Sequence, residues 1–324
     1  GPAGTVLLTG GTGALGRALC QHLVARHGVR HLILLSRSGS AGEKTGAFVS
    51  ALQRAGAQSV RVIAQDVTKR EEVAAALAAA DSNHPLSVVV HLAGALDDGL
   101  FAQQSDARIQ RVLAPKVLGA MHLDSLLPDH VPLILFSSVA GTLGSSGQSS
   151  YAAANAFLDA LAARRRARGG RGQSLAWGLW EPRGGGMTAH LGVKDLARFA
   201  RQGFAVLSAA VGFDCFDQAL AVEDAHVLPV ELRLADVKED GAVHPLLRSL
   251  RSEAPRRSSR AQDAAESAGL KEQVAALPPE ARGPFLLERV RKEVAAVLGL
   301  ATAHAVHERQ TLSELGLDSL MAVE

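Results

Sequence analysis

The chain has little of several residue types that usually mark redox, metal-binding or secreted proteins. It contains one tyrosine and two cysteines among 324 residues, and aromatic residues make up only 4%. Cys20 and Cys215 lack a CxxC spacing, which favours reduced, structural thiols in a cytoplasmic protein. The twelve histidines are scattered, and His304 and His307 have no partner ligands near them in sequence. No metal site is therefore predicted.

Long apolar runs and a strong net charge are also missing. No run of about eighteen apolar residues occurs, and the first residues do not resemble a signal peptide, so no membrane association is predicted. The net charge of +2 gives no electrostatic basis for binding nucleic acid. The basic run 164–168 falls at the end of a predicted helix, where cations complement the helix dipole.

The chain does have a regular alternation of short apolar runs with alanine-rich helical segments. Helices are expected over 14–27 and 208–222, among others. Strand alternating with helix at this spacing predicts an α/β, Rossmann-like, doubly wound parallel sheet, with ligands beyond the carboxyl ends of the strands. The predicted strands are 5–8, 31–35, 60–64, 86–90, 132–136, 174–177 and 226–230.

Composition divides the chain into three parts. Residues 1–250 are predicted to form the nucleotide-binding domain, 251–268 a polar linker, and 269–324 a partial all-α domain. The clearest helix of the last part spans 285–299. Residues 187–205, after a glycine run, are predicted to form short helices of a substrate lid.

A glycine-rich segment follows the first predicted strand. Gly11, Gly13 and Gly16 have the GxGxxG spacing between a strand and a helix, which predicts a loop that lets backbone approach a pyrophosphate. An ordinary tight turn is the alternative. The second strand ends in Ser36 and Arg37, where an NAD site would place an acid. Because an arginine can pair with a 2′-phosphate, NADPH is favoured over NADH.

The ends of the next two strands supply further candidate contacts for the cofactor. Asp66 and Val67 follow the third strand, where an acid can meet the adenine, although an aspartate there is also a common cap. His91, Ala93 and Gly94 follow the fourth strand and would lie beside the cofactor ribose.

Tyr151 stands in the pattern expected for carbonyl reduction. It follows Ser138 by thirteen residues and precedes Asn155 by one helical turn, so that Tyr151 and Asn155 share a helix face. Nicotinamide chemistry supplies a hydride, and the growing alkoxide needs a proton donor such as a phenol. Ser137 is the competing serine, but the spacing favours Ser138.

Residues 1–250 resemble the catalytic subdomain of a ketoreductase domain from a modular type I polyketide synthase, within the short-chain dehydrogenase/reductase superfamily. Most of that superfamily carries a lysine four residues after the tyrosine, whereas this chain has Asn155 there and Lys116 in an earlier Pro-Lys-Val segment, an exchange typical of polyketide ketoreductases. The resemblance rests on segments 9–16, 35–39, 91–94, 115–120, 136–138 and 151–155.

The resemblance implies NADPH-dependent reduction of a β-ketoacyl thioester, carried by an acyl carrier protein, to the 3-hydroxyacyl thioester. Tyr151 would donate the proton, Ser138 would bind the carbonyl, Lys116 would lower the pKa of the phenol, and Asn155 would support a water relay. It also places Gly178 near the nicotinamide. The complete predicted cofactor set is Gly10, Gly11, Thr12, Gly13, Leu15, Gly16, Ser36, Arg37, Asp66, Val67, His91, Ala93, Gly94, Lys116, Tyr151 and Gly178.

A further marker concerns the configuration of the product. In this family the triplet Leu96-Asp97-Asp98 accompanies B-type reduction, which gives the D-hydroxyl, and the position of the A-type tryptophan is Leu143 here. We expect these three residues, together with Met187 at the start of the lid, to orient the substrate.

The last motif lies close to the end of the chain. Residues 314–321 resemble the phosphopantetheine attachment site of an acyl carrier protein, with Ser319 as the residue that carries 4′-phosphopantetheine. A helix cap at Asp318 or Ser319 is a compatible interpretation. Because the chain ends five residues after Ser319, we expect a truncated carrier domain. Expected partners are the carrier-bound substrate and other synthase domains, including a structural ketoreductase half and an enoylreductase inserted between the halves.

Two other functions are compatible with parts of the pattern. A free-standing short-chain alcohol dehydrogenase would share the fold, but the exchange of Lys116 and Asn155 and the carrier motif argue against it. A reductase-inactive scaffold usually loses a catalytic residue, and this chain keeps Tyr151, Ser138, Lys116 and Asn155.

Overall fold

The computed structural model of the chain describes residues 3–37, 39, 43–181, 196, 199–200, 202–234, 244–250, 270–298, 302–303, 306–307 and 311. The chain divides into two compact units, Gly1–Leu246 and Leu247–Glu324. The predicted linker 251–268, Met187 and Ser319 lie outside the described residues. Among the residues described, none of the helices combines the length and the apolar character needed to cross a membrane.

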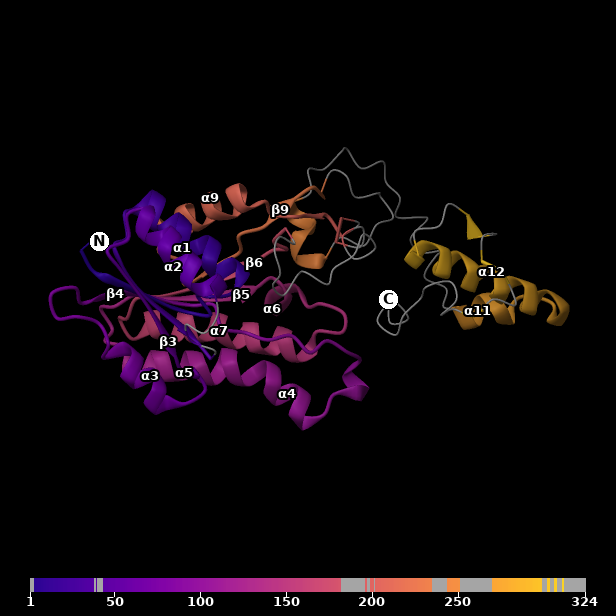
Figure 1. The fold of residues 1–324 in the computed structure, drawn as a ribbon. Helices are drawn as coiled ribbons and strands as arrows, with labels where there is room; N and C mark the ends of the chain where they lie inside the picture. Colours follow the sequence, from indigo (N-terminus) through magenta and orange to yellow (C-terminus); the bar gives the residue numbers. More distant parts are fainter. Residues whose placement is uncertain are drawn as a thin grey trace. The chain divides into compact units, whose positions relative to one another are not determined.

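The first unit is built on a seven-stranded sheet in which every pairing is parallel (Figure 1). The strand order is β3-β2-β1-β4-β5-β6-β8. The chain therefore adds β2 and β3 on one side of β1, and then crosses over to add β4, β5, β6 and β8 on the other side. The switch point of the sheet therefore lies between β1 and β4, which is where ligands bind in such folds. The strands are β1 (Thr5–Thr9), β2 (His31–Ser36), β3 (Ser59–Ala64), β4 (Leu86–His91), β5 (Leu133–Ser138), β6 (Gly172–Trp177) and β8 (His226–Val227).

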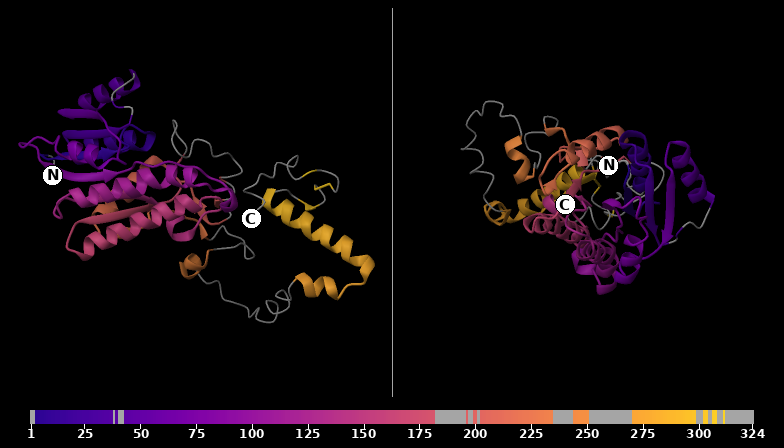
Figure 2. Two further views of the ribbon diagram at one scale, coloured as in Figure 1. Left: turned by 90° about the horizontal axis from the view of Figure 1, so that it is seen from below. Right: turned by 90° about the vertical axis from the view of Figure 1, so that its left-hand side faces the viewer.

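Helices cover both faces of this sheet, which confirms the predicted doubly wound fold. Figure 1 shows α1, α2 and α9 on one face and α3, α4, α5 and α7 on the other, and Figure 2 shows the second group from below. The helices are α1 (Ala14–His27), α2 (Glu43–Arg54), α3 (Arg70–Leu77), α4 (Asp106–Leu113), α5 (Gly119–Leu126), α6 (Ala140–Leu143), α7 (Ser149–Ala167) and α9 (Ala209–Leu220).

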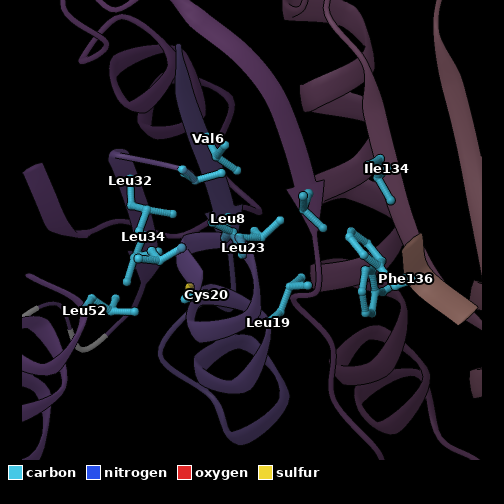
Figure 3. Packing of buried hydrophobic residues seen from close by; sticks show 14 of the residues in the cluster. Val6, Leu8, Leu19, Cys20, Leu23, Leu32, Leu34, Leu52, Ile134 and Phe136 are labelled. Carbon is cyan, nitrogen blue, oxygen red and sulfur yellow. The ribbon is translucent and has the colours of Figure 1, made fainter. Parts of the chain in front are cut away.

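Each face of the sheet has its own apolar core, because successive side chains of a strand point to opposite sides. Leu8 and Leu34 belong to the core beneath α1 and α2, which Figure 3 shows from close by. Leu7 and Ile33 belong to the core on the other face. These strands are buried on both sides, which explains why they are continuous apolar runs in the sequence.

A π turn, η2 (Ala114–Leu118), separates α4 from α5. Pro115 has no N–H to donate within a helix, and the N–H of Gly119 donates to the carbonyl of Ala114, five residues earlier. Such widened turns frequently occur at functional sites. The sequence did not predict this one, and it contains Lys116.

The last strand is shorter than predicted. Only His226 and Val227 pair with β6, after which Gly178 N donates to Pro229 O at 3.0 Å. Proline cannot donate to a neighbouring strand, so the ladder ends there. A small antiparallel pair, β7 (Phe204–Ala205) with β9 (Glu231–Leu232), was not predicted. The described residues also include two short 3₁₀ segments, η1 (Phe101–Gln103) and η4 (Pro245–Leu250).

In the second unit, two helices are described, α11 (Leu270–Ala275) and α12 (Pro279–Leu298). The helix expected over 285–299 begins earlier, at Pro279, which is a residue suited to the first turn of a helix. Val294, Ala295 and Val306 form a small apolar cluster.

Candidate active site

The predicted glycine-rich loop lies between β1 and α1. Gly10 has a φ of +69°, which favours glycine, and a Cβ on it would lie 3.0 Å from the backbone nitrogen of Ala93. A Cβ on Gly16 would lie 2.5 Å from Gly10 O and 2.7 Å from Gly11 Cα, both backbone atoms. The loop therefore folds against the start of α1 more closely than any other residue type allows. Gly13 is the N-cap residue of α1 and makes no side-chain hydrogen bond to the first N–H groups of this helix, which are the kind of groups that bind anions.

The ends of β2 and β3 bring a positive charge close to an acid. Ser36 pairs in register with Ala64, and Arg37 is exposed directly after β2. Asp66 Oδ1 accepts a hydrogen bond from Thr68 N at 2.9 Å, so this carboxylate caps the turn after β3. Burial raises the pKa of Asp66, but its hydrogen bonds with Thr68 and the charge of Arg37 outweigh burial and hold that pKa below its ordinary value.

His91, which was predicted among the cofactor contacts, has both ring nitrogens in contact with protein atoms. Its ring is buried, with Nδ1 2.7 Å from Thr9 Oγ1 and Nε2 3.2 Å from the carbonyl oxygen of Lys116. Burial and the neighbouring Lys116 lower the pKa of His91 to about 3, so the ring is neutral. The ring ties β4 to β1 and to the π turn. Val67 is likewise buried, against Gly119.

Gly94 and Gly178 lie at the carboxyl ends of strands on the same edge of the sheet. A Cβ on Gly94 would lie 3.0 Å from Lys116 Cε, so a larger residue would displace the lysine. Gly178 follows β6, and a Cβ on it would lie 3.3 Å from Val230 Cγ1. Both glycines leave room for the side chains that converge on this edge.

Tyr151, Ser138 and Asn155 meet where β5 ends and α7 begins. The side chains of Asn155 and Ser138 lie close enough to the Tyr151 hydroxyl to influence its pKa. Burial raises the pKa of Tyr151, the nearby side chains of Asn155 and Ser138 lower it in part, and the net direction is upward. Ser137 instead donates to the backbone carbonyl of Asn155 at 3.2 Å, so this serine holds α7 against β5.

Asn155 is completely buried. Its Nδ2 donates to Tyr151 O at 2.8 Å. Within the part of the chain that the structure describes, its Oδ1 is buried without a hydrogen-bond partner. A buried acceptor of this kind is suited to an ordered water.

Lys116 reaches the same place from the π turn. Its Nζ donates to Phe136 O at 2.8 Å and lies 5.4 Å from the centroid of the Tyr151 ring. Burial lowers the pKa of Lys116 to about 7, against a smaller opposing effect of Asp159. The pKa of Tyr151 was expected to fall because of Lys116, but burial governs that pKa in this structure and raises it.

The predicted substrate-orienting loop, which begins at the half-buried Leu96, is held by ion pairs and hydrogen bonds that the sequence analysis missed. Asp97 pairs with Arg108 at 2.7 Å and with Arg111 at 2.6 Å. Arg108 also donates to Asp98 O at 2.6 Å. The sequence did contain a signal of this pairing: Arg108 and Arg111 lie three residues apart, and so on one face of α4, shortly after the two adjacent acids.

The same loop is attached to the turn just before Tyr151. Asp98 Oδ2 accepts from Gln148 Nε2 at 2.9 Å, and Gly99 N donates to Gly147 O at 2.8 Å. The charge of Asp98 contributes to the raised pKa of Tyr151. These acids are therefore structural partners of the candidate active site and not solvated loop charges.

The family assignment follows from a comparison with protein families. The model of the KR domain matches residues 4–182. The chain belongs to the KR domain family. A second family, the phosphopantetheine attachment site, matches residues 288–324. The chain therefore carries the ketoreductase domain of a modular polyketide synthase and a phosphopantetheine-binding region, as the motifs predicted.

Relatives and solved structures agree with this assignment. The chain is 45% identical over 328 residues to the spectinabilin polyketide synthase system protein NorB of Streptomyces orinoci, covering 100% of this chain and 15% of NorB. It is similar, at 34% identity and a TM-score of 0.65, to the first-module ketoreductase of phoslactomycin biosynthesis in Streptomyces sp. HK803, covering 78% of this chain and 56% of that one.

An A-type ketoreductase from a modular polyketide synthase is equally similar in structure. It also has 34% identity and a TM-score of 0.65, with 78% of this chain and 50% of that chain covered. The overall fold therefore does not distinguish the two configurations of the product, and an argument about configuration depends on individual residues.

Proposed function

We propose that this ketoreductase domain reduces a β-ketoacyl thioester, carried by an acyl carrier protein, to the 3-hydroxyacyl thioester with NADPH. The observation that carries the proposal is the convergence of Tyr151, Ser138, Lys116 and Asn155 at the carboxyl edge of β5. The side chains of Asn155 and Ser138 lie close enough to the Tyr151 phenol to lower its pKa in part, and Lys116 Nζ lies 5.4 Å from its ring centroid.

The glycine loop supports binding of a dinucleotide, since added Cβ atoms would collide with the loop backbone. The loop from Gly10 to Gly16 would hold the pyrophosphate, and Arg37 the 2′-phosphate. Asp66 and Val67 would border the adenine. The remaining predicted contacts would surround the nicotinamide and its ribose; they are Ala93, Gly94, Lys116, Tyr151 and Gly178. His91 would support them through its contacts with Thr9 and with the carbonyl of Lys116. When bound, NADPH supplies the hydride that adds to the carbonyl carbon.

Tyr151 supplies the matching proton. Because its pKa is raised, the phenol is protonated at neutral pH and can transfer its proton to the carbonyl oxygen as the C–O double bond becomes a single bond. The Ser138 hydroxyl donates a hydrogen bond to the same oxygen. The phenolate left on Tyr151 lies close to Lys116, whose pKa of about 7 lets it exchange a proton near neutral pH. A water on Asn155 Oδ1 completes the return of a proton to Tyr151.

We infer B-type reduction, which gives the D-hydroxyl. The triplet Leu96-Asp97-Asp98 supports this, and so does Leu143 in place of a tryptophan. The hydrogen bond between Asp98 and Gln148 fixes the triplet beside Tyr151, so a substrate that contacts it would enter from one side.

We assign residues 1–250 to the reductase, 251–268 to a linker and 269–324 to part of a carrier domain whose Ser319 bears 4′-phosphopantetheine. Met187 would begin a lid over the substrate. Partners would be other domains of the same synthase, including a structural ketoreductase half. The two cysteines, both unpaired, support a cytoplasmic location.

The test is reduction of a β-ketoacyl N-acetylcysteamine thioester by the purified chain, followed by NADPH absorbance and by chiral chromatography of the product. We expect faster turnover with NADPH than with NADH, and a D-hydroxyl. Arg37→Ser should weaken NADPH and leave NADH unchanged, whereas Arg30→Ser serves as an exposed control.

Other outcomes separate the alternatives. NADPH binding without turnover would favour a scaffold, and faster reduction of simple ketones than of thioesters would favour an alcohol dehydrogenase. An L-hydroxyl would contradict the role given to Leu96-Asp97-Asp98 and leave the reductase assignment intact.

A further inference from the structure

Three side chains with metal-binding atoms meet between α1 and α9, on the face of the sheet where Figure 1 shows both helices. His22 Nε2 lies 2.8 Å and His27 Nε2 2.7 Å from the same oxygen of Asp217, Oδ1. One ligand atom from each residue lies within 4.8 Å of the other two. The histidines are about 190 residues from Asp217 in sequence, which is why the sequence indicated no metal site.

We propose that His22, His27 and Asp217 form a binding site for one divalent transition-metal ion, with Zn²⁺ as the expected ion. Two imidazole nitrogens and one carboxylate oxygen are ligands that zinc accepts, with water in the fourth position. Mg²⁺ and Ca²⁺ prefer oxygen ligands and fit this set poorly.

The ligand atoms need to move little to accept the ion. Zinc–ligand distances of about 2.0–2.2 Å place tetrahedral ligand atoms about 3.3 Å apart. The two Nε2 atoms are at 2.8 Å and 2.7 Å from Asp217 Oδ1, so a small separation of α1 and α9 side chains suffices. Both nitrogens now donate to the carboxylate, and metal binding requires their lone pairs, so the protons move to Nδ1 or to solvent.

The surroundings hold the ligands in place and still admit an ion. The His22 ring stacks on Phe213 with centroids 4.7 Å apart and an interplanar angle of 11°, and Phe216 meets it edge-on. The side chains of His22, His27 and Asp217 are 15%, 33% and 26% exposed. A stacked imidazole keeps its orientation, which reduces the entropy lost on metal binding.

An ion at this site would link two segments that flank the candidate active site. α1 begins at the glycine loop, and Phe213 of α9 lies 5.4 Å from the Trp180 ring, which follows β6. A ligand that binds only the folded state stabilises it by mass action. With free Zn²⁺ about a hundredfold above its Kd, we expect Tm to rise by about 5–10 °C.

The test uses Co²⁺ as a spectroscopic substitute on the full chain, after chelator treatment and dialysis. We expect one Co²⁺ per chain, with intense visible d–d bands of a four-coordinate site that Zn²⁺ abolishes by competition. His27→Gln and Asp217→Asn should each weaken Co²⁺ binding by more than about tenfold. His130→Gln, an exposed histidine between α5 and β5, is the matched control and should change nothing.

Three results would overturn the proposal. The first is the absence of a saturable Co²⁺ spectrum, which would mean that the three residues form a His–Asp–His hydrogen-bond bridge and no metal site. Another is Co²⁺ binding that is equal in the wild type, His27→Gln and Asp217→Asn. A third is a thiolate charge-transfer band, which would assign the metal to Cys20 or Cys215. Circular dichroism of each variant without metal establishes that it is folded, and His27, the most exposed of the three ligands, is the variant least expected to unfold.

Discussion

Replacing Lys116 by methionine should stabilise the domain while it removes turnover. Lys116 is 2% exposed, and burial lowers its pKa from 10.5 to about 7. At about 1.4 kcal/mol for each tenfold change in acidity, this fall corresponds to at most about 5 kcal/mol of unfavourable free energy for keeping the ammonium in the folded state. Methionine has a similar length and no charge.

The lost hydrogen bond offsets part of that gain. Lys116 Nζ donates to Phe136 O, and a hydrogen bond from a charged donor contributes about 1.5–3 kcal/mol. The net expectation is a gain of about 2–3 kcal/mol for Lys116→Met at pH 6, or a rise in Tm of about 4–12 °C.

The pH dependence gives the sign of the effect. Below pH 7 Lys116 is charged in both the folded and the unfolded state, and the folded state bears the full desolvation cost. As the pH rises from about 7 to 10.5, Lys116 is neutral in the folded state but still protonated in the unfolded state. The free energy of unfolding of the wild type therefore increases over this range. The advantage of Lys116→Met should therefore shrink and disappear over this range.

The assay is thermal unfolding by circular dichroism at pH 6, 7.5 and 9.5. Lys69→Met is the control, because Lys69 is 62% exposed and pairs with Glu72. It should lower Tm slightly or leave it unchanged at every pH. A lower Tm of Lys116→Met at pH 6, or a difference from wild type that does not vary with pH, would refute the reasoning.

Two further predictions concern the loop and the core. Gly16→Ala should prevent NADPH binding, measured by calorimetry, because the added Cβ would lie 2.5 Å from Gly10 O. The control is Gly46→Ala on α2, whose Cβ would meet nothing within 4 Å and which should stabilise the domain by about 0.5–1 kcal/mol. Equal NADPH affinity of the two variants would contradict this prediction. Asp124→Asn should destabilise by about 3–5 kcal/mol in urea unfolding, because it removes the nearer carboxylate partner of the fully buried Arg165, at 3.0 Å, and leaves only Asp129 at 3.7 Å. A loss under about 1 kcal/mol would disagree.

The sequence predicted the parts of the fold that depend on local patterns. Continuous apolar runs such as 31–35 indicated strands buried on both faces, and the structure places β2 at His31–Ser36. The helix over 14–27 was predicted with its observed bounds. Strand 226–230 was overextended: only His226 and Val227 pair with β6, and Pro229, which cannot donate to a neighbouring strand, already stood within the predicted run.

Interactions between distant residues were harder to predict. The basic run 164–168 was predicted to lie at the end of a helix, and Arg164–Arg166 do lie in the last turn of α7. What was not predicted is that Arg165 is completely buried and donates to Asp124 and to the carbonyls of Pro128 and Val131. Only the fold brings those acceptors together, since they are more than thirty residues away.

The candidate site shows the same division. The spacing of Ser138, Tyr151 and Asn155 was readable because only the short helix α6 separates β5 from α7. Lys116 could be included only through its resemblance to a family motif, because its approach depends on the π turn. The raised pKa of Tyr151 comes from burial, which a sequence does not show.

The account depends most directly on Tyr151 as the proton donor. The measurement is the rate of NADPH oxidation with a β-ketoacyl N-acetylcysteamine thioester by the wild type and by Tyr151→Phe, with NADPH affinity measured by fluorescence on both. We predict that turnover falls by about 100- to 10,000-fold while NADPH affinity changes little. Turnover by Tyr151→Phe within about tenfold of the wild type, at equal NADPH affinity, would contradict the assignment of this phenol as the acid.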